Sequence, residues 1–336
     1  MAQIIWFTEP NNYDAVLTSS PDYNFQAQFT ALYVKPGATN THYAAEALTL
    51  PVESPNWKIH DINKKYHFGF DLFFKAPIHK VNSALFINWE HFKSCDTAGA
   101  VTDSDNMLGP FFEIGPDASP YFKAAGIVKF NFNEINLDYG QNIDIGDHLT
   151  TNIFAGISFV KICETLDYTY SGIETSQAVS RNILTPTRFK GVGPQAGISF
   201  LYDIVHGLGI AGKLSGSLLS GKSYNHTTYT SNSPFATTDP NIQTTTTNCL
   251  SLMVPSLFQR IGLTYGYNFR DHYEIRAEIG YQAQVYFNAL QTVDMGSEVV
   301  SPPVSSSSIG VYARTFQRNI SNFTLSGAYF TFAVGF

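Results

Sequence analysis

The segment that decides the fold is Tyr273–Leu290, which reads YEIRAEIGYQAQVYFNAL. Its odd positions carry Tyr, Ile, Ala, Val and Phe, whereas its even positions include Glu274, Arg276, Glu278, Gln282 and Gln284. Strict alternation of apolar and polar residues is typical of a β-strand with two different faces. The alternation lasts well beyond the roughly 5–6 residues of an average strand, so we predict an unusually long strand here.

Similar segments recur along the whole chain. Ten of them show the pattern: Phe25–Pro36, Lys64–Lys75, Lys80–Lys93, Tyr121–Tyr139, His148–Tyr170, Arg188–Asp203, Gly207–Thr227, Asn248–Phe269, His272–Thr292 and Ser321–Phe336. Short connections such as Ala76–His79 alternate with long polar ones such as Ser171–Thr187, Thr228–Thr247 and Val293–Ile320. Short periplasmic turns and long extracellular loops are typical of an up-and-down barrel in an outer membrane.

We therefore predict an all-β fold, a transmembrane antiparallel up-and-down β-barrel of about ten strands. Eight or twelve strands remain open, mainly because Gly37–Asn63 and Val293–Ile320 could hide extra strands. A membrane forces such closure because backbone groups in lipid must all be paired. The alternative is a soluble β-sandwich whose aromatic residues fill a core.

The segment Tyr121–Tyr139 changes phase. Apolar residues occupy its even positions up to Phe132 and its odd positions from Ile135 onward. A β-bulge near Asn133 or Glu134 would reconcile the two halves, and we expect one there.

Composition narrows the class of protein. The 336 residues are 44% hydrophobic, 15% aromatic and only 14% charged, whereas an ordinary soluble domain has about 25% charged residues. The net charge is −7 and Lys and Arg do not cluster, so nucleic acid is not an expected partner. We expect residues 1–24 to be a periplasmic lead-in that follows a removed signal peptide, and residues 25–336 to form a single barrel domain.

Aromatic residues mark one end of the predicted strands. If the short turns are periplasmic, the strand ends on that side carry Phe25, Phe74, Tyr139, Tyr202, Phe269 and Tyr273, each on the apolar face. An aromatic girdle at the membrane interface predicts this coincidence. The core of a soluble sandwich gives no reason for it.

The C-terminal strand ends in an aromatic residue after alternating apolar positions. Phe330, Phe332, Val334 and Phe336 share one face. This pattern resembles the insertion signal that the assembly machinery of bacterial outer-membrane barrels reads.

Several strings also resemble a known family, the Legionella-type pore-forming outer-membrane proteins, whose members are major outer-membrane-protein-like β-barrels. The strings are FFEIGPDAS at 111–119, NLDYG at 136–140, the run from Gly280 to Glu298, and ARTFQR at 313–318. The resemblance covers nearly the whole chain. It implies a signal-cleaved, surface-exposed pore in the outer membrane of a Gram-negative bacterium, without naming the solute.

The polar faces of the predicted strands give a lumen of mixed charge. The residues predicted to line it are Gln26, Gln28, Thr30, Asp71, Asn88, Glu90, Lys129, Asn131, Gln195, Lys213, Arg260, Glu274, Arg276, Glu278, Gln282 and Gln284. Both signs are present, so the lumen is not a single-sign ion filter. Because about eight strands enclose just enough space for side chains to fill, ten strands predict a narrow lumen.

Two functions fit this barrel. The first, which the sequence favours, is a passive, weakly selective pore of small conductance, limited by a belt in which Glu274 and Glu278 pair with Arg260. The second is a structural or adhesive surface barrel whose loops bind host or envelope components. Large facing side chains and paired charges in the lumen would favour the second. Expected partners are outer-membrane lipid, lipopolysaccharide, the barrel-assembly machinery, small solutes or ions, and further copies of the chain.

We expect no catalytic residue, cofactor or metal. The GxGxxG match at Gly207 precedes an alternating strand, whereas a dinucleotide site needs a helix there. A membrane-embedded enzyme is a third hypothesis, but carboxylates such as Asp71 and Glu90 are better explained by pairing with cations. Cys95, Cys163 and Cys249 are expected near the extracellular end, where disulfides between neighbouring molecules are possible.

Overall fold

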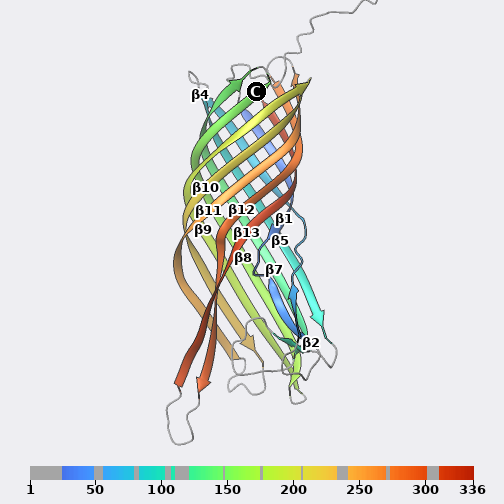
Figure 1. Cartoon of the computed structure of the whole chain (residues 1–336), viewed down its shortest axis with the longest axis vertical. Coiled ribbons are helices and arrows are strands. Elements are labelled where there is room, and N and C mark those ends of the chain that lie inside the picture. Colours follow the sequence, from blue (N-terminus) through green and yellow to red (C-terminus); the bar gives the residue numbers. More distant parts are fainter. Residues whose placement is uncertain are drawn as a thin grey trace, which may run out of the picture.

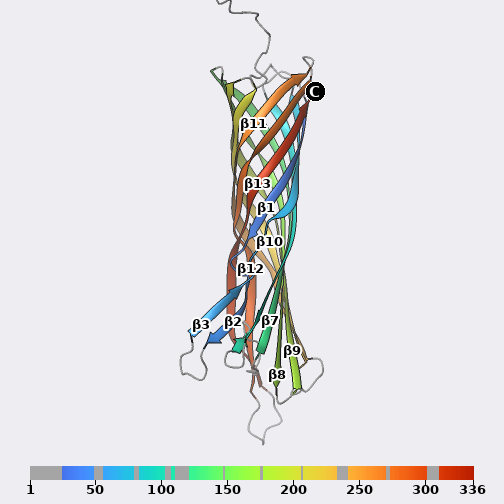
Figure 2. The same ribbon diagram turned by 90° about the vertical axis from the view of Figure 1, so that its right-hand side faces the viewer.

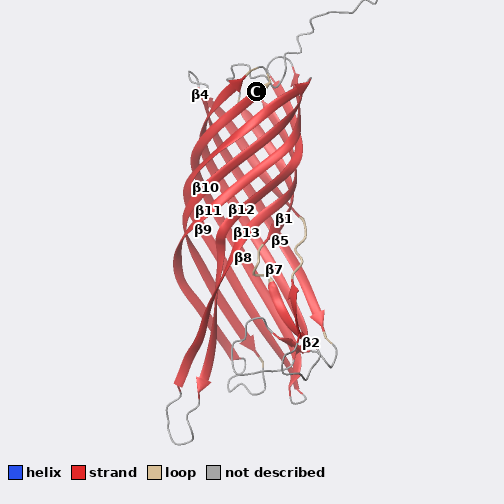
Figure 3. Cartoon of the chain, in the orientation of Figure 1, coloured by secondary structure: helices blue, strands red, loops and turns tan. Residues whose placement is uncertain are grey.

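The structure is a computed structural model that describes residues 25–48, 56–78, 83–102, 107–109, 121–146, 148–174, 177–205, 207–232, 241–269, 273–300 and 310–336. Its strands are β1 (Gln26–Gly37), β2 (His42–Leu48), β3 (Asn56–Asp61), β4 (His67–Ile78), β5 (Ser83–Val101), β6 (Met107–Gly109), β7 (Tyr121–Ile145), β8 (Leu149–Glu174), β9 (Gln177–Val205), β10 (Leu208–Ser231), β11 (Asn241–Phe269), β12 (Tyr273–Val300) and β13 (Gly310–Gly335). The described ranges contain no helix long and apolar enough to cross a membrane. Figure 3 shows how completely strands dominate the described chain.

Ten of the strands close into a ring of antiparallel neighbours, in the order β1, β4, β5, β7, β8, β9, β10, β11, β12, β13 and back to β1. The closing pair joins β1 to β13, with registers from Gln26↔Gly335 to Gly37↔Thr324. The strands are steeply tilted around a tall cylinder (Figures 1 and 2). The predicted ten-stranded up-and-down barrel is therefore confirmed. Residues 1–24, the predicted lead-in, lie outside the described residues.

The two ends of the barrel differ. One end, here called the turn end, carries the β7–β8 turn at Gly146, the β9–β10 turn at Gly207, and Phe336. Both glycines have positive φ, 68° and 85°, which favours glycine. Gly207 therefore serves a tight turn into β10, and the GxGxxG match has this structural explanation. The opposite end, where β8 meets β9 and β10 meets β11, is called the loop end.

Much of the chain predicted as long loops is in fact strand. The connection predicted at Ser171–Thr187 is almost entirely β8 and β9, and strands also cover parts of Thr228–Thr247 and Val293–Ile320. Beyond the predicted segments, these strands carry many Ser and Thr residues and lack the apolar outer face that reveals a strand by alternation. Gly37–Asn63 does hold two extra strands, β2 and β3, which with β6 extend the sheet at the loop end without joining the ring.

The apolar and polar faces of the strands exchange sides partway along the barrel. On β8, Ile153, Ile157 and Phe159 face outward and are exposed, but from Lys161 to Ser171 the outward face carries no large apolar side chain and Ile162 packs inside. The outer face thus suits lipid near the turn end and water near the loop end, and the interior changes in the opposite sense. We call the apolar outward residues at which this change occurs on β5, β7, β8 and β9 the boundary row. It consists of the cross-strand neighbours Trp89, Ile135, Phe159 and Val192.

This reversal also explains the phase change in β7, where the predicted bulge is wrong. The pairing of β7 with β8 runs without a register shift from Lys123 to Ile145. Even-numbered residues point inward throughout, so Phe132 and Glu134 share one face. What changes between them is the surrounding medium, not the backbone.

Candidate functional site in the barrel interior

The interior holds most of the residues predicted to line a lumen. Those on the inward face are Gln26, Gln28, Thr30, Asp71, Asn88, Glu90, Gln195, Lys213, Arg260, Glu274, Arg276, Glu278, Gln282 and Gln284. The prediction is wrong for Lys129 and Asn131. They alternate with the buried Val128 and Phe130 and so lie on the outer face. Because a bulge was predicted, the odd-numbered face of this half of β7 was wrongly assigned to the lumen.

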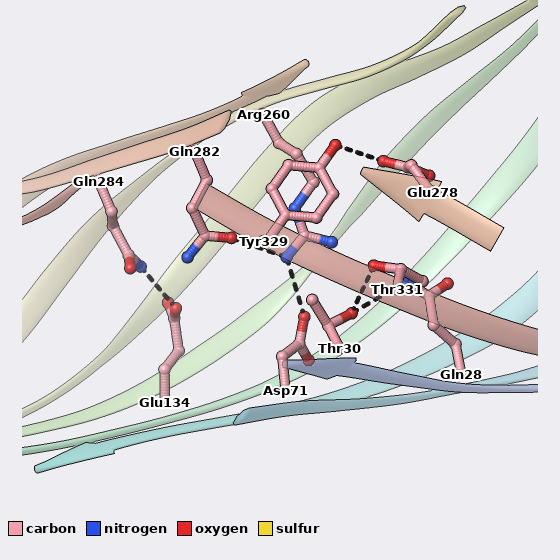
Figure 4. Close-up of polar contacts among 10 residues, drawn as sticks. All are labelled: Gln28, Thr30, Asp71, Glu134, Arg260, Glu278, Gln282, Gln284, Tyr329 and Thr331. Carbon is pink, nitrogen blue, oxygen red and sulfur yellow. Dashed lines mark hydrogen bonds and ion pairs between the residues drawn. The ribbon is translucent and has the colours of Figure 1, made fainter. Parts of the chain in front are cut away.

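Arg260 on β11 reaches across the lumen to Asp71 on β4, although three ring strands lie between them on the shorter way round. Its Nη2 lies 3.3 Å from Asp71 Oδ2 and donates to Gln282 Oε1 at 2.8 Å. Its guanidinium carbon lies 4.4 Å from the centre of the Tyr329 ring, and Tyr329 donates its hydroxyl to Glu278 (Figure 4). The side chains of Arg260 and Asp71 are 9% and 5% exposed, so this ion pair is largely removed from water.

Asp71 belongs to a row of three carboxylates on neighbouring strands. Asp71 pairs in register with Glu90 on β5, and Glu90 pairs with Glu134 on β7. Like charges directly opposite one another destabilise a sheet, so the row requires compensation from the opposite wall. Arg260 compensates Asp71. Glu134 accepts a hydrogen bond from Gln284 Nε2 at 2.8 Å (Figure 4) and another from Ser158 Oγ at 3.0 Å.

The bond between Glu134 and Gln284 spans the full width of the barrel. Glu134 lies on β7 and Gln284 on β12, and four ring strands separate them on either side. A second bond, from Gln195 Nε2 to Asp138 Oδ2 at 2.9 Å, joins β9 to β7 along one wall, over Gly156 on β8. The Arg260–Asp71 ion pair and the Glu134–Gln284 bond are therefore the contacts that bridge the polar lumen among the described residues.

An apolar cluster packs inside the barrel just beyond the polar region, toward the loop end. We call Phe130, Phe132, Tyr286 and Phe323 the aromatic plug. The ring centres of Phe132 and Tyr286 lie 5.6 Å apart, and both rings are 5.6 to 6.2 Å from Phe323. Because Phe132 and Tyr286 come from opposite strands, this contact also crosses the whole lumen. All four side chains are buried.

The predicted charged belt differs in its pairing. Arg260 contacts Asp71 and Gln282, whereas the sequence suggested Glu274 and Glu278 as its partners. Arg276 instead pairs with Glu274 on its own strand, at the more open turn end. Glu134, Asp138, Tyr286 and Tyr329 were missing from the prediction; the unbroken even-numbered face of β7 was the signal that would have found the first two.

The aromatic residues at the turn end lie as expected. Phe25, Phe74, Tyr139, Tyr202 and Tyr273 are exposed on the outer face, and the side chain of Phe269 lies outside the described part of the chain. In the C-terminal strand, Phe330, Phe332 and Phe336 are exposed and Val334 shares their outward face. These positions form an apolar outer edge near the turns.

The three cysteines lie beyond the boundary row, toward the loop end. Cys95 and Cys249 are exposed, Cys163 is half-buried, and none of them is in a disulfide. Among the described residues, no group of three or more His, Cys, Asp or Glu side chains is arranged to hold a metal ion.

A closed antiparallel ring with an apolar outer band and a polar interior defines an outer-membrane β-barrel. Residues 18–336 match the family described as the Legionella pneumophila major outer membrane protein precursor. The chain belongs to this family, which places it in an outer membrane.

Comparison with solved structures finds other barrels at low identity. The outer membrane protease OmpT from Escherichia coli is 11% identical, with 96% of this chain and 99% of that chain covered and a TM-score of 0.44. The translocator domain of the autotransporter NalP from Neisseria meningitidis is 8% identical, with 94% and 89% covered and a TM-score of 0.30. A FadL homologue from Pseudomonas aeruginosa is 8% identical, with 93% and 90% covered and a TM-score of 0.26. No curated protein matches the sequence.

Proposed function

We propose that this protein is a structural, surface-presenting barrel whose lumen is shut at rest. The observation that carries the proposal is the contact between Phe132 and Tyr286, whose ring centres lie 5.6 Å apart although their strands face each other across the barrel. A ten-stranded barrel is close to the size that side chains can fill. A filled lumen leaves the outer surface and the loop end as the parts available for function.

We place the loop end outside the cell and the turn end in the periplasm. Short periplasmic turns and longer extracellular segments are the usual arrangement of such barrels. The extra strands β2, β3 and β6 then enlarge the exposed surface. Trp57 and Ile59 on β3 are exposed there, so this edge offers apolar side chains to host or envelope components.

A narrow pore is the second candidate, and the polar belt below the aromatic plug favours it. Arg260, Asp71 and Glu134 would be an unusual choice for an inert core, because buried charges are costly even when paired. In this alternative the plug moves aside and small solutes or ions pass the belt, with weak selectivity because both charge signs are present.

Single-channel recording of refolded protein in a planar bilayer tests the proposal. We expect the wild-type protein to give no steady conductance. The triple variant Phe132→Ala, Tyr286→Ala, Arg260→Ala removes both the plug contact and the ion pair, and it should open a small conductance. The matched control Phe159→Ala, Phe287→Ala removes outward rings and should stay silent.

Steady conductance from the wild-type protein would contradict the closed barrel and support the pore. In that case Arg260→Gln with Arg276→Gln should shift selectivity toward cations, because Asp71, Glu274 and Glu278 would then act without these positive neighbours. An unchanged selectivity would place the constriction elsewhere in the molecule.

A further inference from the structure

Three lysines form a row on the outer surface, immediately beyond the boundary row. Lys161 on β8 pairs in register with Lys190 on β9, and Lys190 pairs with Lys222 on β10. All three face outward, and Lys190 and Lys222 are exposed. Since neighbouring strands lie about 4.8 Å apart, three positive charges are held side by side on one patch, here called the lysine row.

Further cations extend the patch across five neighbouring strands. Arg188 lies two residues beyond Lys190 on β9, and Lys129 on β7 and Lys93 on β5 also face outward. None of these cations forms an ion pair within the described chain. Lys129, which the sequence had placed in the lumen, thus belongs to an outer basic surface.

The surroundings of the lysine row supply no compensating charge. Its lateral neighbours are Asn133 on β7 and Ser251 on β11. The first outward carboxylate farther along β8 is Asp167, which accepts a hydrogen bond from Asn182. Like charges directly opposite one another in a sheet are destabilising, and this chain carries a net charge of −7. An uncompensated row of cations on an acidic protein therefore indicates an anionic ligand.

The height of the row identifies what kind of anion. Lys161 and Lys190 lie two residues beyond Phe159 and Val192, the exposed apolar residues of the boundary row. Two residues of strand span about 7 Å along the strand, or about 5 Å along the barrel axis at the ~40° tilt typical of such barrels. This height falls within the headgroup layer, which is about 5–7 Å thick on each side of the hydrocarbon. Within the described part of the opposite side of the ring, no such row of cross-strand cations occurs: Lys35 on β1 has the uncharged Ser326 on β13 as its neighbour.

We propose that the lysine row, with Arg188, binds the phosphate groups of a phosphorylated glycolipid of the outer leaflet, that is, lipopolysaccharide. Its acyl chains would lie against Phe159 and Val192 while its phosphates contact the ammonium groups. Lysine is a common phosphate ligand and acts as a point charge. The inference rests on the proposed orientation, with the loop end outside, but it does not depend on whether the lumen is shut.

Titration of the full-length protein in detergent micelles with purified lipopolysaccharide tests the site. The double variant Lys190→Gln, Lys222→Gln should bind about 30-fold more weakly, because each Lys near an anionic headgroup contributes about fivefold in affinity. The control Lys65→Gln, Lys123→Gln removes the same charge from exposed positions away from the row and should bind as the wild type does. Heat-dependent gel mobility confirms that each variant is folded.

Two further ligands identify the source of the phosphate. Lipopolysaccharide stripped of its phosphates should bind the wild type as weakly as the intact lipid binds the double variant. Inorganic phosphate at the same concentration should not displace the intact lipid. Equal affinity of the double variant and the wild type, or equal losses in both double variants, would overturn the proposal, as would displacement by inorganic phosphate alone.

The orientation has its own measurement. Cys95 and Cys249 are exposed at the loop end, so a membrane-impermeant maleimide should label them on intact cells. Labelling only after cell lysis would refute the orientation, whereas the titration in micelles would still report on the binding site itself.

Discussion

Replacing Arg260 by Met should destabilise the barrel far more than any surface ion pair would suggest. The substitution keeps most of the side-chain volume but removes the cation. Asp71, whose side chain is 5% exposed, then loses the only charged hydrogen-bond donor it has among the described residues, and Glu90 lies next to it in register. Gln282 Oε1 loses its donor as well.

The magnitude follows from burial. Breaking a buried ion pair by removing one partner costs about 3–5 kcal/mol, because the remaining charge is left uncompensated. The double variant Arg260→Met, Asp71→Leu removes both charges, so it should lose less stability than Arg260→Met alone. Arg276 and Glu274 form the matched control, with side chains 22% and 28% exposed. Arg276→Met should cost no more than about 1 kcal/mol.

Urea unfolding in lipid vesicles, followed by gel mobility, measures these free energies. A double-mutant cycle then gives the coupling between Arg260 and Asp71 directly. If Arg260→Met costs no more than Arg276→Met, or if the two substitutions at the pair are simply additive, the contact across the lumen does not hold the barrel together.

Three other outcomes are expected. Ile279→Arg puts a charge on a lipid-facing position that is 61% exposed and should cost about 2–4 kcal/mol at mid-membrane, whereas Thr97→Arg, outward at the loop end, should fold normally; equal folding yields would refute the assigned faces. Burial raises the pKa of Glu164 from 4.5 to about 7, although Asn40 donates a hydrogen bond to it. The unfolded chain therefore loses this proton at lower pH than the folded protein does, so the free energy of unfolding should fall as the pH rises from about 4.5 to 7. Glu164→Gln should abolish that fall and stabilise the protein by up to about 3 kcal/mol at pH 8. If the variant keeps the pH profile of urea unfolding that the wild type shows, Glu164 is not its cause. Cys95 and Cys249 are exposed at the loop end as free thiols, so non-reducing gels of native membranes should show no reductant-sensitive multimers, and the appearance of such multimers would show that neighbouring copies are covalently linked.

The sequence alone was sufficient to predict the strands in the membrane-spanning half of the barrel. There, lipid outside and polar contacts inside impose strict alternation, which Tyr273–Leu290 shows directly. It was insufficient for the loop-end half. The run Thr244–Thr247 has no alternation, yet it lies in β11 and pairs with β10. Backbone pairing with the neighbouring strand makes this run a strand, and no local pattern of hydrophobicity predicts it.

The side-chain contacts across the lumen could also not be predicted from the sequence. Phe132 and Tyr286 meet only because β7 and β12 lie opposite each other and their registers bring both rings to one height. Likewise, Arg260 contacts Asp71 across the ring, whereas Glu278 on the neighbouring strand accepts from Tyr329. Register and strand tilt set these heights, and neither is written in the alternation of a single strand.

The exchange of apolar and polar faces could nevertheless have been recognised by comparing the sequences of neighbouring strands. A bulge is local to one pair of strands, whereas a change of medium must occur at one height on all of them. The outward face changes at Phe159 on β8 and at Val192 on β9, which are cross-strand neighbours. The phase change of β7 at Ile135 lies in the same row. Agreement between adjacent strands therefore excludes a bulge. Above that row the outside is water, so apolar side chains are driven inward, and this is why the aromatic plug lies just beyond the membrane while the charged contacts lie within it.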